Sequence, residues 1–188
     1  MQSLSSPAVA SPRLAAFDRP AERVAGILAF TLLTALGAFV RIPLPFTPVP
    51  VTLQTFFVLT AGLYLGGRDA AISQLGYLGL GAAGLPVFAG GAGVAHLLGA
   101  TGGYLLAFPV VAWLVGATVR PGDGAGRATA VFAAATLTIF GCGAAWLARV
   151  AGLDLAAALA LGVLPFLPGA ALKIAAAVAL AVRAPLSR

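Results

Sequence analysis

Long apolar blocks alternate with short polar, proline-rich or glycine-rich breaks along the whole chain. A helix needs about 20 apolar residues to cross the roughly 30 Å hydrocarbon core of a bilayer. Six blocks approach that length, at about residues 24–40, 52–65, 70–84, 104–119, 128–150 and 168–183. The pattern predicts an all-α integral membrane protein with six transmembrane helices. We expect one membrane domain over 23–188, after a flexible cytoplasmic N-terminal tail over 1–22.

The composition strengthens this interpretation. Hydrophobic residues make up 61% of the chain and charged residues only 9%, whereas soluble domains carry about 25% charged residues. The formal charge of +6 is spread singly between apolar blocks. The basic residues therefore form no stripe of the kind that contacts phosphates, and we expect no nucleic-acid partner. The N-terminal segment lacks the early apolar core of a signal peptide.

The arginines predict the orientation, because cytoplasmic loops of membrane proteins are enriched in positive charge. With the N-terminus inside, only Arg41 and Arg149 fall on the outer side. The cytoplasmic set is Arg13, Arg19, Arg23, Arg68, Arg120, Arg127, Arg183 and Arg188. The expected topology is therefore N-in and C-in.

This topology gathers three irregular segments on the outer side, over 42–51, 84–103 and 151–168. Non-helical backbone at membrane depth is tolerated only where it is buried in protein or lines a cavity. We therefore expect an outward-facing cavity. Proline fixes the backbone and removes a hydrogen-bond donor, so the prolines of 42–51 predict a stiff lid. Within 151–168, residues 151–163 predict a short helix at the membrane face.

Lys173 is the only lysine, and it lies inside the last apolar block. A charged residue at the centre of a span costs about 2.5–3.5 kcal/mol on insertion scales. A cation near a helix N-terminus adds to the positive end of the helix dipole and favours an anion there. We predict that Lys173 binds a carboxylate. The alternative is that its amine reaches the outer surface along an apolar stem.

Gln54 directly follows the proline-rich segment. Its amide carries donors and an acceptor, which suits a ligand such as a cyclic urea, and it would otherwise need internal partners. Thr52 and Thr55 are weaker candidates, since threonine readily bonds to its own helix. Tyr77 and Gln74 are further candidates for the cavity wall, with an interfacial position as the alternative for Gln74.

Phe88 and Tyr104 are suited to packing against a flat apolar ring, although single aromatic residues are more often packing or interface residues. His96 has no second ligand at metal spacing, so we interpret it as a loop or interface residue. Cys142 is interpreted as a small packing residue. No metal or cofactor is expected. The acidic residues all fall in tails or turns, which leaves no general acid or base at membrane depth and favours a binding protein over an enzyme.

Small residues lie four apart in the first block. Ala25 with Ala29, and Thr31 with Ala35, have the spacing that lets another helix approach closely. Thr34 and Ala38 have the same four-residue spacing. Internal packing is the alternative in so alanine-rich a chain.

Four stretches together resemble a known family: "PVPVTLQTF", "GLPVFAGG", "TGGYL" and "LPFLPGAALK". The chain resembles the BioY family over nearly all of 24–183. Members are the biotin-specific substrate-binding (S) components of energy-coupling factor (ECF) transporters. The resemblance implies the six-helix ECF S-component fold in a bacterial cell membrane. It also implies high-affinity capture of biotin in an outward-facing pocket, and inward delivery with an ECF transmembrane coupling protein and two ABC-type ATPases.

The resemblance also implies roles for individual residues. The biotin carboxylate would pair with Lys173, the ureido ring would suit Gln54 and Tyr77, and the thiophane ring would lie on Phe88 and its neighbours. Ala25 and Ala29 match the surface that meets the coupling protein, with Thr31 and Ala35 as the alternative. The segment that closes over biotin contains Pro43, Pro45, Phe46, Pro48 and Pro50. The alternative function is a stand-alone carrier or facilitator of biotin or another small carboxylate.

One position departs from the family pattern. The family has "LPGDLLK" where this chain has "LPGAALK", so Ala170 stands in place of an aspartate. Also, "FAGGAGV" lacks an arginine that some members carry. Lys173 is therefore left without an internal counter-ion, and it is the only cation that we nominate for the carboxylate.

Overall fold

The computed structural model describes residues 19–120 and 123–183. These residues form helices joined by short connections, with one two-stranded antiparallel sheet. The elements in chain order are α1 (Pro20–Phe39), β1 (Arg41–Ile42), β2 (Val51–Thr52), α2 (Gln54–Leu65), α3 (Gly67–Ala82), α4 (Gly93–Leu97), α5 (Gly102–Thr118), α6 (Ala125–Ala151), α7 (Leu155–Gly162), the 3₁₀ helix η2 (Leu164–Phe166) and α8 (Leu167–Arg183).

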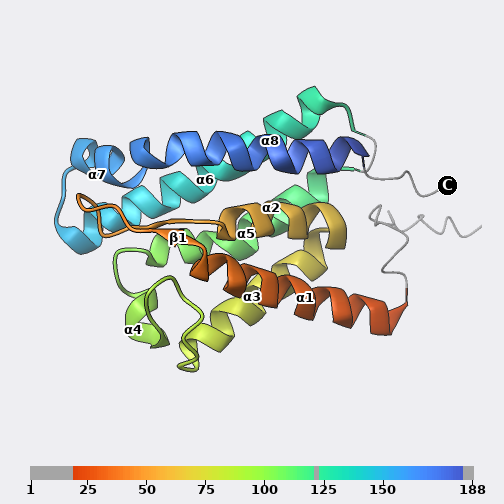
Figure 1. Ribbon diagram of the computed structural model, residues 1–188, viewed down its shortest axis with the longest axis horizontal. Helices are drawn as coiled ribbons and strands as arrows, with labels where there is room; N and C mark the ends of the chain where they lie inside the picture. Colours follow the sequence, from red (N-terminus) through yellow and green to blue (C-terminus); the bar gives the residue numbers. More distant parts are fainter. Residues whose placement is uncertain (1–18, 121–122, 184–188) are drawn as a thin grey trace, which may run out of the picture.

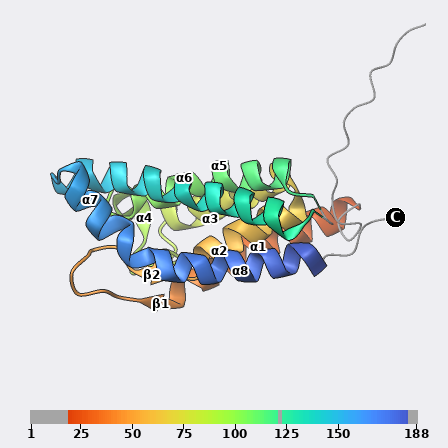
Figure 2. The ribbon, with the colours of Figure 1, turned by 90° about the horizontal axis from the view of Figure 1, so that it is seen from above.

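The long helices form an elongated bundle with two different ends (Figure 1). One end carries the start of α1 and the end of α8. The opposite end carries the β1–β2 connection, α4 and α7, and Figure 2 shows the same grouping from above. The prediction that the three irregular segments share one end is therefore confirmed.

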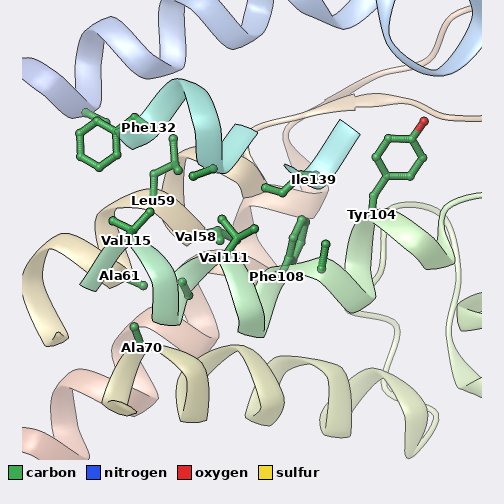
Figure 3. Packing of buried hydrophobic residues seen from close by; sticks show 14 of the residues in the cluster. Val58, Leu59, Ala61, Ala70, Tyr104, Phe108, Val111, Val115, Phe132 and Ile139 are labelled. Atoms are coloured by element: carbon green, nitrogen blue, oxygen red, sulfur yellow. The ribbon is translucent and has the colours of Figure 1, made fainter. Parts of the chain in front are cut away.

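Helix α5 lies in the middle of the bundle, packed against α2, α3 and α6. Its side chains Val111 and Val115 are fully buried among residues of α2 and α6 (Figure 3). Small residues bring the backbones together: a side chain at Gly116 would collide with Gly66 and Gly67. Close approach through small residues is the usual way in which helices associate in membranes.

The helices begin and end within a few residues of the predicted blocks, and two differences have clear causes. First, α1 begins at Pro20, so residues 20–22 belong to the helix and not to the predicted tail. Proline is favoured at the first helical position, and the Glu22 carboxylate accepts a hydrogen bond from the Arg19 backbone N–H at 3.1 Å. Residues 1–18 of the predicted tail lie outside the described residues.

Second, the break at 66–69 between the second and third predicted blocks is reduced to Gly66, whose φ of 74° suits glycine. Arg68 and Asp69 already belong to α3. Asp69 is buried, and Arg23 of α1 donates two hydrogen bonds to its carboxylate at 2.9 and 2.8 Å. This pair fastens the start of α3 to the start of α1.

The proline-rich segment forms a feature that the sequence did not predict. Arg41 pairs with Thr52 and Ile42 with Val51, so 41–52 is a short β-hairpin. Pro43 follows β1 and Pro50 precedes β2. Proline cannot donate to a strand ladder, which explains why the pairing stops there and the tip of the hairpin stays irregular.

Three helical segments are long and apolar enough to cross a bilayer: α1, α6 and the run from Leu155 to Arg183. Helices α2 and α5 are apolar but shorter. Large apolar side chains such as Leu28, Leu32 and Leu36 of α1 are more than half exposed, which a lipid environment accommodates. The chain is thus a membrane protein; the count of six spans and the N-in, C-in topology remain predictions.

Candidate ligand-binding site

A cavity of about 60 Å³ lies beneath the β-hairpin. Its walls come from elements that are distant in sequence: the hairpin, α2, α4, α5, α6, η2 and α8. Most of the wall is apolar, with a few polar groups converging on it, as in typical small-molecule sites. The lining residues are Val49, Pro50, Thr52, Gln54, Thr55, Ala89, His96, Thr101, Tyr104, Leu105, Phe108, Ile139, Phe140, Phe166 and Lys173.

Lys173 projects from the second turn of α8 into this cavity. Its ammonium group donates to the Thr52 backbone carbonyl at 2.9 Å and to the Thr55 hydroxyl at 2.8 Å. An ammonium group has three N–H donors, and no carboxylate lies within ion-pair distance of this one among the described residues. Among the described residues, the Lys173 ammonium therefore has only neutral hydrogen-bond partners. One of its three N–H groups remains for a ligand.

Gln54 begins α2 and is only 2% exposed. Its amide oxygen accepts from the Thr52 hydroxyl at 3.1 Å, and its amide nitrogen donates to the Tyr77 hydroxyl at 2.6 Å. The Tyr77 hydroxyl donates in turn to the Val87 carbonyl at 3.3 Å. This chain fixes the orientation of the amide, which keeps one N–H and one lone pair for further hydrogen bonds.

Tyr104 lies near the start of α5 and lines the cavity with its ring. Its hydroxyl donates to the Gly162 carbonyl at the end of α7, at 2.8 Å. The ring lies against Gly143 of α6, where a side chain would occupy the same space. Tyr104 therefore ties α7 to the bundle while its ring forms part of the wall.

His96 of α4 lines the cavity, which the sequence did not predict. Its ring stacks on Phe88, with centroids 5.3 Å apart and planes inclined by 15°, and one ring nitrogen lies 3.3 Å from the Thr101 hydroxyl. Burial lowers the pKa of His96 below its usual value, so the imidazole is neutral near pH 7. A lone histidine beside glycines gave no signal that distinguished it from an interface residue.

The predicted site residues fall into two layers. Gln54, Tyr104 and Lys173 are in the wall. Tyr77 and Phe88 lie directly behind it: Tyr77 orients Gln54, and Phe88 packs on Tyr77 and His96. Direct substrate contact by these two residues therefore finds no support in the lining of this cavity.

Gln74 lies elsewhere, between α1 and α3. Its amide nitrogen donates to the hydroxyls of Thr34 and Ser73 at 3.2 and 3.1 Å. The residue is fully buried and absent from the cavity lining. Neither an interfacial position nor a place in the wall fits it; Gln74 is a packing residue of the α1–α3 contact.

Only part of the predicted lid segment lines the cavity. Pro50, with Val49 and Thr52, lines the cavity. Pro43 and Pro48 border a separate hollow beside Arg41. Pro45 and Phe46 are exposed at the hairpin tip, so Phe46 offers an apolar side chain to the surroundings.

The two predicted partner pairs of α1 differ in exposure. Ala25 and Ala29 are exposed and are available to another helix. Thr31 and Ala35 are buried, and the Thr31 hydroxyl donates to the Ser73 carbonyl of α3 at 2.9 Å. The second pair is therefore wrong as an external surface, because α3 already covers it.

The described part of the chain contains no group of three His, Cys, Asp or Glu residues placed to hold a metal ion. The cavity wall carries no acidic residue. Its polar groups are a cation, an amide, hydroxyls and a neutral imidazole, a set whose chemistry suits a polar anion.

The sequence model of the BioY family matches residues 8–187. The chain belongs to the BioY family. It is 44% identical over 165 residues to a probable biotin transporter BioY from Pyrococcus horikoshii, covering 87% of this chain and 96% of that protein. It is 36% identical over 157 residues to the biotin transporter BioY of Rhizobium etli, covering 76% and 81% of the two chains.

The fold agrees with this membership. A crystal structure of the S-component for biotin from an ECF-type ABC transporter superposes with a TM-score of 0.78 at 28% identity, covering 87% of this chain and 90% of the other. The chain thus has the S-component fold, and it is a transport protein and not an enzyme.

Proposed function

We propose that this protein is the high-affinity biotin-binding S component of an ECF importer. The observation that carries the proposal is the ammonium of Lys173, which enters a mostly apolar cavity with only neutral partners among the described residues. A charge that is partly buried among apolar side chains, as that of Lys173 is, is costly unless it is paired. A carboxylate ligand supplies the missing partner.

Biotin has a group for the cation, for the amide and for the aromatic part of the wall. Its carboxylate accepts the remaining N–H of Lys173. Its ureido ring offers both N–H and C=O to the free donor and acceptor of Gln54. Its sulfur-containing ring is apolar and packs on aromatic wall residues such as Tyr104, Phe140 and Phe166.

The hairpin controls access in this proposal. The cavity of about 60 Å³ is well below the roughly 300–1,000 Å³ of typical small-molecule sites. Binding therefore requires the wall to widen, and the β1–β2 hairpin is the part of the wall that has an irregular, exposed tip. We assign it the role of the lid.

The membrane arrangement completes the proposal. Helices α1, α2, α3, α5, α6 and α8 cross the cell membrane, with both termini inside and the cavity facing outward. The exposed pair Ala25 and Ala29 meets the ECF transmembrane coupling protein, and two ABC-type ATPases supply the energy for inward delivery.

Binding of radiolabelled biotin to the purified protein in lipid nanodiscs, without ATP, tests the core of this proposal. We expect tight binding, and Lys173→Ala should weaken it at least about tenfold, since one charged hydrogen bond is worth about 1.5–3 kcal/mol. Arg68→Ala is the control, because Arg68 is exposed at the opposite end of the bundle and lies outside both the cavity lining and the hairpin. Equal affinities of the protein and Lys173→Ala for biotin contradict the role of the ammonium.

Uptake distinguishes the proposal from a stand-alone carrier. Cells that express this chain without any ECF coupling protein or ATPase should bind biotin but accumulate little of it. Accumulation at the full rate in such cells favours the stand-alone carrier.

A further inference from the structure

A long groove runs along the outside of the bundle between α5 and α6, which lie side by side (Figure 2). Its volume is about 560 Å³. The base of the groove includes the small residues Gly103 and Ala107, and its rim includes the exposed side chains Leu106 and Val110. It shares no lining residue with the ligand cavity.

The dimensions of the groove match one leaflet of a bilayer. Along α6 it extends from Thr138 to Arg149, which at 1.5 Å per residue is about 16 Å. Half of the hydrocarbon core is about 15 Å. The lining is almost entirely apolar, so water fills such a groove poorly, whereas an acyl chain fits its length and chemistry.

A single charge marks one end of the groove. Arg149 lies in the last turn of α6 and is exposed, and it forms no ion pair with any described residue. The groove lining contains no acidic residue. A guanidinium matches the geometry of a phosphate with two parallel hydrogen bonds.

Trp146 lies one turn before Arg149 and is held in place. Its indole N–H donates to the Gly99 carbonyl at 2.9 Å, and Gly103 of α5 fits against the same side chain. Tryptophan is favoured at the depth where acyl chains meet headgroups. Trp146 and Arg149 together therefore mark the headgroup end of the groove.

We propose that this groove binds an anionic phospholipid, with an acyl chain along α5 and α6 and the phosphate on Arg149. A second copy of this chain suits the groove less well, because a symmetric pair would bring two Arg149 side chains to one interface with no carboxylate in the groove to pair them. The outer-leaflet position rests on the proposed topology; the site itself does not depend on biotin.

Tryptophan quenching tests the site. The chain has two tryptophans, so Trp113→Phe leaves Trp146 as the only one. This variant is reconstituted in phosphatidylcholine vesicles with a small fraction of brominated phosphatidylglycerol or, separately, brominated phosphatidylcholine. We expect the anionic lipid to quench Trp146 about fivefold more effectively per mole, the preference expected of one cation at an anionic surface.

Arg149→Gln in the same background should abolish this preference. Arg120→Gln, which removes an arginine from the other end of the bundle, should leave it unchanged. Equal quenching by the two lipids, or a preference that survives Arg149→Gln, overturns the proposal. A disulfide dimer through Cys142, which lines the groove, together with weak quenching by both lipids, overturns it in favour of a second copy.

Biotin binding is measured on the same samples and keeps the two proposals separate. Because Arg149 lies outside the cavity lining, Arg149→Gln should bind biotin as the parent does. Failure of every sample to bind biotin contradicts the proposed function and leaves the lipid result standing.

Discussion

The two ends of the bundle each contain a charged side chain, buried in the case of Asp69 and half-buried in the case of Lys173, and the two have different partners. At the end that carries the start of α1 and the end of α8, the Asp69 carboxylate is 2% exposed and receives two hydrogen bonds from Arg23. At the hairpin end, Lys173 has a backbone carbonyl and a hydroxyl as partners. The first charge is neutralised within the chain and serves the fold. The second lacks a counter-ion among the described residues, which is the arrangement of a binding site.

The largest effect should come from removing the charge of Lys173 while keeping its length. Lys173→Met should lose biotin affinity by more than about tenfold, yet its melting temperature Tm without ligand should be equal or higher, because burying an apolar side chain is cheaper than burying a charge. Isothermal titration calorimetry in detergent measures the biotin affinity, and thermal unfolding in detergent measures Tm. A large drop in Tm without ligand would show that Lys173 serves the fold as Asp69 does.

The opposite pattern should follow from Arg23→Ala. Removing one partner of an ion pair whose other partner is buried destabilises a protein; the Arg23 side chain is 34% exposed, so screening by solvent moderates the loss. Tm should fall while the biotin affinity of the folded protein stays constant. Arg68→Ala, on the same turn of α3 as Asp69, is the control and should change Tm little. A loss of biotin affinity in Arg23→Ala would contradict the division of roles between the two ends.

Giving Lys173 an internal counter-ion should make the two ends more alike. Ala170 is buried one turn before Lys173 on α8, so Ala170→Asp places a carboxylate on the same face. The preference for biotin over the uncharged biotin amide should fall about tenfold, since a charge-assisted contact of about 1.4 kcal/mol is then satisfied internally. Competition binding with both ligands measures the preference, and Ala170→Asn is the uncharged control. An unchanged preference would mean that the new carboxylate does not reach the ammonium.

A smaller effect should follow from Tyr77→Phe, which removes the acceptor of the Gln54 amide without changing packing. We expect about 1 kcal/mol, or roughly a fivefold loss of biotin affinity, as for one ordinary hydrogen bond. Tyr64→Phe on α2 removes a hydroxyl outside the cavity lining and should bind biotin normally. Equal losses in the two variants would indicate a general effect on the bundle.

The smallest effect should be a dependence on pH. Because burial lowers the pKa of His96 in the folded protein, the unfolded chain binds its proton more readily, and stability falls as pH drops below about 6.5. His96→Phe keeps an aromatic ring against Phe88 and should flatten the change in Tm between pH 7.5 and pH 5.5. The same slope in both proteins would assign the dependence to another group.

The sequence predicted the helices well and the site in part, for physical reasons that differ by residue. Lys173 and Gln54 were found because a charge or an amide in an apolar block is costly and calls for an explanation. The sequence did not identify three apolar residues of the cavity wall, which are Ile139, Phe140 and Phe166. An apolar residue that lines a cavity looks the same in sequence as one that packs in the core. The contact of Lys173 with Thr52 joins residues 121 positions apart, and no local pattern encodes such a pairing.

The β-hairpin shows another limit. The prolines excluded a helix, but strands of two residues leave almost no alternation to detect. His96 was misjudged because its neighbours in the fold, Phe88 and Thr101, come from turns whose path depends on glycine geometry.

The hydrogen bond from Lys173 to the Thr52 carbonyl has a kinetic consequence, because Thr52 belongs to the hairpin. Under the proposed function, the same amine binds the carboxylate of biotin and holds the hairpin over the cavity. Opening of the hairpin would then break the hydrogen bond between Lys173 and Thr52, so the proposal couples the residence time of biotin to the opening of the hairpin.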